Sequence, residues 1–123
     1  MSVGRQQLGR SGEALAEALL CTRGYRILAR NYRTRLGEID LIARDGKTLV
    51  FVEVKVRRSG RFGSAKAAVT AAKRRKLSML ALQYLKITPE KPAHVRFDVV
   101  AVEPGTDGPR LELVQNAFEL AYP

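Results

Sequence analysis

The stretch Gly37–Val56, GEIDLIARDGKTLVFVEVKV, decides the fold because it reads as two β-strands joined by a tight turn. Asp45-Gly46 between two β-rich runs is a strong hairpin signal. The second run, Thr48–Val56, is apolar on both faces until Glu53, which is typical of a strand in the middle of a covered sheet. The stretch therefore predicts a hairpin inside a layered α/β domain.

The segments around this hairpin supply two helices and three further strands. Helical apolar spacing precedes the hairpin and stops at Gly24, and strong helix formers follow a basic, glycine-containing loop. The expected elements are a helix at Leu8–Arg23, a strand at Tyr25–Tyr32, a helix at Ala65–Leu85, and strands at Val95–Val102 and Leu111–Val114. The order α-β-β-β-α-β, with an appended strand, predicts one domain over residues 1–123 with a mixed sheet flanked by helices. Asn116 is expected to cap a final helical turn.

Two opposite charges share one face of the central strand. Glu53 and Lys55 are two residues apart, so their side chains project to the same side. Desolvating such a pair is costly, which favours a position at a cleft where the charges have a function. The alternative is that the strand emerges into solvent at this point and leaves both side chains exposed.

The predicted hairpin brings further carboxylates toward this pair. With Asp45-Gly46 as a two-residue loop, Asp40 lies opposite Phe51 and diagonal to Glu53, roughly 7–8 Å away along the backbone. Glu38 then lies opposite Glu53 on the same face. A three-residue loop would turn these side chains to the other face.

Converging carboxylates of this kind predict a divalent metal site. Oxygen ligands without histidine or cysteine partners favour Mg²⁺ or Mn²⁺ over zinc. A cation would also relieve the repulsion between like charges. Such an ion clamps a phosphate oxygen and lowers the pKa of bound water, while Lys55 orients the nucleophile or neutralises developing charge.

The net charge of +10 is concentrated in one segment. Ten basic residues and no acid lie between Lys55 and Lys86, and the rest of the chain sums to zero. A field of this kind attracts polyanions such as nucleic acid; the alternative is a solvated helix face. The residues expected to bind nucleic acid are Arg57, Arg58, Arg61, Lys73, Arg74 and Arg75.

Other features exclude several classes of protein. The only cysteine is Cys21, which rules out an intrachain disulfide and a cysteine-based zinc site. No stretch approaches the ~18 apolar residues that a membrane span needs, and the polar N-terminus lacks the apolar run of a signal peptide. We therefore expect a cytoplasmic protein without a membrane partner. For Asp98 we expect an ion pair or a hydrogen bond at a strand edge.

The spacing from Asp40 to Glu53-Val54-Lys55 resembles the Asp…Glu-x-Lys signature of the PD-(D/E)XK nuclease superfamily, whose restriction-endonuclease-like core has the same α-β-β-β-α-β order. Several stretches together resemble the YraN-type family of uncharacterised bacterial proteins, regarded as distantly similar to archaeal Holliday-junction resolvases. They are Leu8–Glu13, Gly24–Leu28, Gly37–Ile42, Phe51–Lys55, Arg61–Ser64 and Arg96–Val100.

The resemblance implies a metal-dependent endonuclease acting on DNA, with branched or junction DNA as the suggested substrate. It implies that Asp40, Glu53 and Val54 form the metal site, that Lys55 serves the attacking water, and that Glu13 completes the acidic cluster. A homodimer would let so small a domain span a junction, although the sequence shows no interface. The alternatives are a non-catalytic nucleic-acid-binding module on the same fold and an adaptor that binds an acidic protein.

Overall fold

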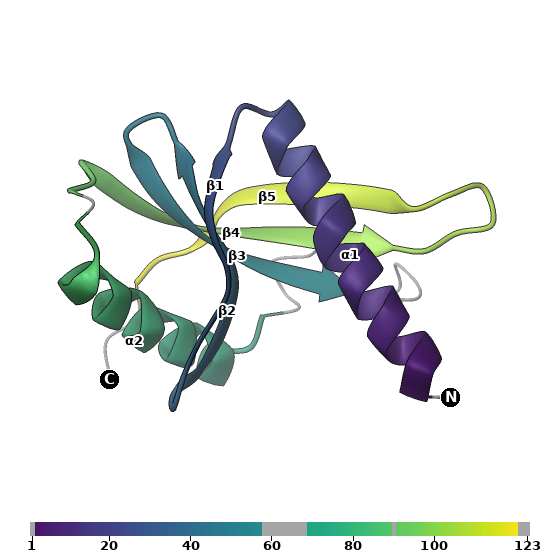
Figure 1. The fold of residues 1–123 in the computed structure, drawn as a ribbon, viewed down its shortest axis with the longest axis horizontal. Helices are drawn as coiled ribbons and strands as arrows, with labels where there is room; N and C mark the ends of the chain where they lie inside the picture. The colour runs from purple at the N-terminus through teal and green to yellow at the C-terminus, as the bar shows by residue number, and fades with distance from the viewer. Residues whose placement is uncertain (1, 58–68, 90, 121–123) are drawn as a thin grey trace.

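The computed structural model describes residues 2–57, 69–89 and 91–120, with side chains from Gly12 onward. Within these ranges it contains a five-stranded sheet and two helices (Figure 1). The elements are α1 (Ser2–Thr22), β1 (Arg26–Thr34), β2 (Gly37–Asp45), β3 (Thr48–Val56), α2 (Ala71–Ile87), β4 (His94–Glu103) and β5 (Arg110–Phe118). The predicted α/β class and the α-β-β-β-α-β order with an appended strand are confirmed.

The sheet is mixed, as predicted, and β3 lies at its centre in the order β1-β2-β3-β4-β5. β3 and β4 run parallel, whereas the other neighbouring pairs are antiparallel. Parallel neighbours cannot be joined by a tight turn, and the chain between them includes α2.

The two helices cover opposite faces of this sheet. On β3, Leu49 and Phe51 pack in the cluster that includes Leu77 and Leu80 of α2. Val50 and Val52 point the other way and pack with Ala16 and Leu20 of α1. This alternation on a strand buried from both sides confirms the interpretation of Thr48–Val56 as a central strand. Glu53 is the first charged residue that this strand places in the interior, and it is 8 % exposed.

The predicted register of the β2–β3 hairpin is wrong by two positions. Asp45 pairs with Thr48, so the loop is Gly46-Lys47 rather than Asp45-Gly46, and Ile42 lies opposite Phe51 in place of Asp40. Gly46 has φ +61°, a conformation that favours glycine. Glu53 follows Leu49 and Phe51 at alternate positions of β3, so its side chain faces the side on which α2 lies.

The start of α2 and the role of Asn116 also differ from the prediction. The side chain of Thr70 accepts a hydrogen bond from Lys73 N at 3.2 Å and caps α2, while the expected helical residues before 69 lie outside the described residues. Asn116 caps no helix. It lies inside β5 with φ +52°, and its N–H donates to Asp98 Oδ1 at 2.9 Å.

A buried carboxylate ties three distant segments together on the α1 face. Asp98 is 0 % exposed and accepts hydrogen bonds from Tyr25 Oη at 2.6 Å and from Arg96 Nε at 2.9 Å, besides Asn116 N. Burial, followed by the hydrogen bond to Asp98, raises the pKa of Tyr25 to about 12. The expected ion pair of Asp98 is confirmed. In the described part of the chain, no helix has the length and apolar character to cross a membrane.

Asp98→Ala should lower the free energy of unfolding by about 3–5 kcal/mol, because it leaves the Arg96 guanidinium without its buried counter-ion. Asp45→Ala removes the other carboxylate on Arg96, but the Asp45 side chain is 33 % exposed, so we expect a loss of about 1 kcal/mol or less. Urea unfolding of both variants tests this. Equal losses of unfolding free energy in the two variants would show that the burial of Asp98 does not determine its contribution to stability.

Candidate active site

Asp40 lies where β2 separates from β3. The ladder between these strands ends at the pair Leu41↔Val52, one residue after Asp40 in the chain. Beyond that pair, the backbone N–H of Val54 donates to Asp40 Oδ2 at 2.7 Å. A side-chain carboxylate therefore accepts the hydrogen bond that a backbone carbonyl would accept in a regular ladder. The carboxylate is thereby fixed in the opening between the two strands.

The alternation of side chains breaks at the same point. Ile39 packs on the α2 side of the sheet, yet Leu41, two residues later, packs on the α1 side. The facing position on β1 is Asn31, which lies between two regular ladder pairs and has φ +52°. Asparagine tolerates this left-handed conformation better than most residues. Both strands are thus distorted at one position, and acids from both faces of the sheet reach it.

On the α2 side, Asp40 meets Glu53. The Glu53 side chain is 9 % exposed, and Lys73 Nζ of α2 lies 3.5 Å from its Oε2. Burial, then the charge of Asp40 and hydrogen bonding with it, raise the pKa of Glu53 to about 8, although Lys73 acts in the opposite direction. Without a bound cation, Glu53 therefore keeps a proton at neutral pH.

On the α1 side, Asp40 meets two more acids. Carboxylate oxygens of Glu13, Glu38 and Asp40 all lie within 4.8 Å of one another. Burial first, then the charges of Asp40 and Glu38, raise the pKa of Glu13. With its nitrogen turned toward the acids, the Asn31 amide donates to Glu38 Oε1 at 2.8 Å and to Glu13 Oε2 at 3.3 Å.

Solvent reaches this side through a pocket of about 290 Å³ between α1 and the first two strands. Glu13 and Asn31 line it, together with Glu17 and Arg30, which form a two-pronged ion pair at 2.6 and 2.7 Å. The acids are therefore partly buried but accessible from solution.

Three of the four acids fit a divalent cation by their chemistry and spacing. Mg²⁺ and Ca²⁺ hold oxygens at roughly 2.0–2.6 Å, so two ligands of one ion lie at most about 5 Å apart. Glu13, Glu38 and Asp40 meet that limit. The predicted position of Glu38 is wrong, because Glu38 pairs with Arg33 of β1 instead of lying opposite Glu53. Asp40, one of these three acids, is also the one that contacts Glu53.

Other predicted residues occupy distinct positions. The N–H of Val54 orients Asp40. Lys55 is exposed and follows Glu53 by two residues on β3. Among the described residues, Lys73 and not Lys55 forms the ion pair with Glu53, although a phosphate contact was expected of Lys73. The roles of these residues in catalysis stay predictions.

The predicted nucleic-acid-binding arginines fall into three groups. Arg57 and Arg74 make contacts within the fold, Arg57 with Glu112 at 3.6 Å and Arg74 with the Phe118 ring at 5.5 Å. Arg75 is exposed on α2. Arg58 and Arg61 lie outside the described residues.

Sequence reasoning missed Asn31. Asparagine is depleted in strands, so its presence inside a predicted strand is a signal of irregular backbone. Its contacts with Glu13 of α1 and Glu38 of β2 depend on how these elements pack around β1, which only the folded structure shows.

A family model described as "Uncharacterised protein family UPF0102" matches residues 12–102, which include Glu13, Asn31, Glu38, Asp40 and Glu53. This chain belongs to the UPF0102 family. A UPF0102 protein of Symbiobacterium thermophilum is 56% identical over 114 residues, covering 92% of this chain and 97% of that protein. One of Geobacter metallireducens is 48% identical over 122 residues, covering 99% and 100%. The expected YraN-type family is confirmed.

Glu53→Gln should make the metal-free UPF0102 protein more stable at alkaline pH. Between the ordinary pKa of 4.5 and about 8, folded Glu53 keeps a proton that the unfolded chain loses, so wild-type stability falls as pH rises. Glutamine carries no charge at any pH. The advantage of the variant should grow through this window by up to about 1.4 kcal/mol per pH unit, then level off.

Thermal or urea unfolding in a chelating buffer at several pH values measures this difference. Glu17→Gln is the control, because the hydrogen bond from Arg30 lowers the pKa of Glu17 and its removal gives no alkaline advantage. Parallel stability curves for wild type and Glu53→Gln would contradict the raised pKa.

Proposed function

We propose that this UPF0102 protein is an endonuclease that depends on Mg²⁺ or Mn²⁺ and hydrolyses phosphodiester bonds in DNA. The observation that carries the proposal is the convergence on Asp40 of acids from α1, β2 and β3. Such a concentration of negative charge is costly in a partly buried site unless protons or a cation compensate it.

The metal would be held by Asp40 and Glu53, with Glu13 and Glu38 completing the oxygen ligands. Bound there, it would polarise a phosphate oxygen and lower the pKa of a water molecule. Glu53 must release its proton before it can act as a ligand, so metal binding competes with protonation. Lys73, 3.5 Å from Glu53, would help that carboxylate to ionise.

Lys55 is assigned to the attacking water. It lies on β3 two residues beyond Glu53, on the same face, and its side chain is exposed. An ammonium group there would orient the nucleophile or neutralise charge on the phosphate as it develops. The Asp40…Glu53-Val54-Lys55 spacing, which resembles that of PD-(D/E)XK nucleases, supports the same roles.

The excess of basic residues supports a nucleic-acid substrate. The segment from Lys55 to Lys86 that carries the net charge begins at the candidate site and includes α2. Contacts from lysine and arginine to phosphates recognise the shape of the backbone rather than base sequence. We therefore propose branched or junction DNA as the substrate, in line with the resemblance to junction resolvases.

A second candidate function is DNA binding without catalysis. One observation favours it, because the raised pKa of Glu53 lets a proton compensate part of the acidic charge without any metal. In this case the protein would bind DNA through its basic surface and would not cleave it.

Asp40→Ala and Glu53→Ala should each lower the cleavage rate by about 10²-fold or more, while Glu17→Ala on the same helix as Glu13 should leave it unchanged. The measurement is a panel of flap, fork, four-way and single-stranded DNA with Mg²⁺ or Mn²⁺. Cleavage that survives in both site variants comes from a contaminant and overturns the proposal. DNA binding without cleavage supports the second candidate.

Lys55→Ala should abolish turnover but leave Mn²⁺ affinity almost unchanged, because an ammonium group cannot be a metal ligand. Asp40→Ala should weaken Mn²⁺ binding itself. Isothermal titration with Mn²⁺ separates the two roles, with Lys47→Ala in the hairpin loop as the matched lysine control. Equal losses of affinity for Lys55→Ala and Asp40→Ala would contradict this division.

A further inference from the structure

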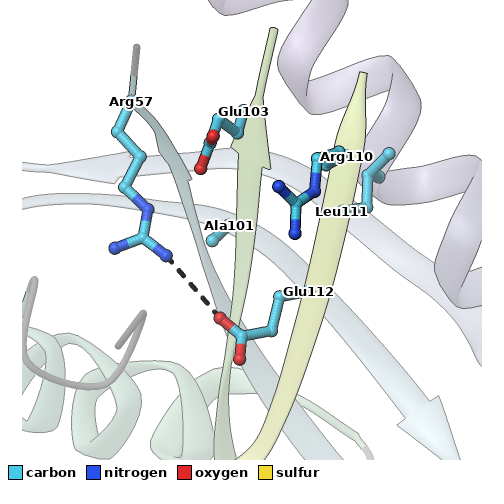
Figure 2. Close-up of a pocket in the computed structure, with 6 residues that line it drawn as sticks. All are labelled: Arg57, Ala101, Glu103, Arg110, Leu111 and Glu112. Atoms are coloured by element: carbon cyan, nitrogen blue, oxygen red, sulfur yellow. Dashed lines mark ion pairs between the residues drawn. The ribbon is translucent and has the colours of Figure 1, made fainter. Parts of the chain in front are cut away.

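A second cavity lies on the sheet beyond the candidate active site, where β3 and β4 end and β5 begins. It has a volume of about 570 Å³, within the range of small-molecule sites. Figure 2 shows four charged side chains directed at the space above the small side chain of Ala101. The lining residues are Arg57, Ala101, Glu103, Arg110, Leu111 and Glu112.

The charges in this pocket balance, because two guanidinium groups face two carboxylates. Arg57 pairs with Glu112 at 3.6 Å, a long ion pair (Figure 2). Glu103 and Arg110 are cross-strand partners on β4 and β5, yet no hydrogen bond or ion pair among the described residues joins them. A donor group and an acceptor group are thus directed into one cavity without satisfying each other.

The pocket adjoins the candidate active site along the sheet. Ala101, its floor, is the partner of Lys55 in the β3–β4 ladder. Glu53, Lys55 and Arg57 occupy alternate positions of one chain segment, and each step of two residues advances about 7 Å. A ligand in the pocket would therefore lie next to a phosphate held at Lys55.

We infer that this pocket binds a guanine base, and, on the strength of the proposed function, that the base belongs to a nucleotide beside the bond to be cut. A phosphate group is a poor fit, because Glu103 and Glu112 would repel it. Guanine offers two adjacent acceptors, O6 and N7, that match an arginine fork. Its N1–H and N2–H₂ groups are adjacent donors that match a carboxylate.

The base must be unpaired to enter this pocket. In a duplex the N1–H group is engaged in pairing, and the base is stacked between its neighbours. A nucleotide at a flap, a fork or a single-stranded end is extruded at little cost. The pocket thus selects for strands that are locally unpaired, which agrees with a preference for branched DNA.

The test measures binding without cleavage. Labelled single-stranded thymine oligonucleotides, with or without one central guanine, are titrated with the full chain in EDTA and followed by fluorescence anisotropy. Guanine should tighten binding about tenfold, as expected for one bidentate contact. Arg110→Ala and Glu103→Gln should remove most of that preference, whereas Arg26→Ala, an exposed arginine on the opposite edge strand, should retain it.

Two results would overturn the inference. One is equal affinity for the guanine and all-thymine strands. The other is that Arg110→Ala weakens binding of both oligonucleotides equally and lowers the slope of log affinity against log salt concentration by about 1. That result would mark a phosphate contact. The cleavage panel is independent of this test. Guanine preference without cleavage would support the pocket inference and contradict the nuclease proposal. Cleavage without guanine preference would support the nuclease proposal and contradict the pocket inference.

Discussion

The hydrogen bond from the Val54 N–H to the Asp40 carboxylate is the constraint on which the candidate site depends. At this point the β2–β3 ladder ends, and a backbone donor in the sheet interior needs another acceptor. Asp40 supplies it, and in doing so fixes its own carboxylate between two strands. Because acids from both faces of the sheet reach this point, one side chain can meet Glu53 on the α2 side and Glu13 on the α1 side.

The rest of the fold makes this distortion tolerable. β3 has four buried apolar residues before Glu53, and every residue of β3 pairs in register with the parallel strand β4. At the candidate site the irregularity lies in β1 and β2, where Asn31 and Asp40 face each other. Strain at a functional site persists when the surrounding structure over-determines it. Here the buried centre of the sheet does so.

The sequence predicted the order of elements well and the site only in part. Strand identity follows from apolar runs, and the run at Thr48–Val56 is unambiguous. The hairpin loop was misplaced because Asp45-Gly46 matches a common turn, whereas folded Asp45 pairs with Thr48 and accepts from Arg96 at 2.8 Å. That second contact joins residues far apart in the chain. Local turn preferences cannot reveal it.

The distribution of charge along β3 connects the candidate metal site with the second pocket. Glu53, Lys55 and Arg57 pass from a buried acid through an exposed base to a half-buried base within five residues. Beside them, β4 presents Val99, then Ala101, then Glu103, so the apolar floor gives way to charge in the same direction. A polynucleotide lying along this row would meet a metal first and a charge-balanced cavity next. The metal at Glu53 and the pocket at Arg57 would then serve chemistry and base selection separately, four residues apart along one face of the chain.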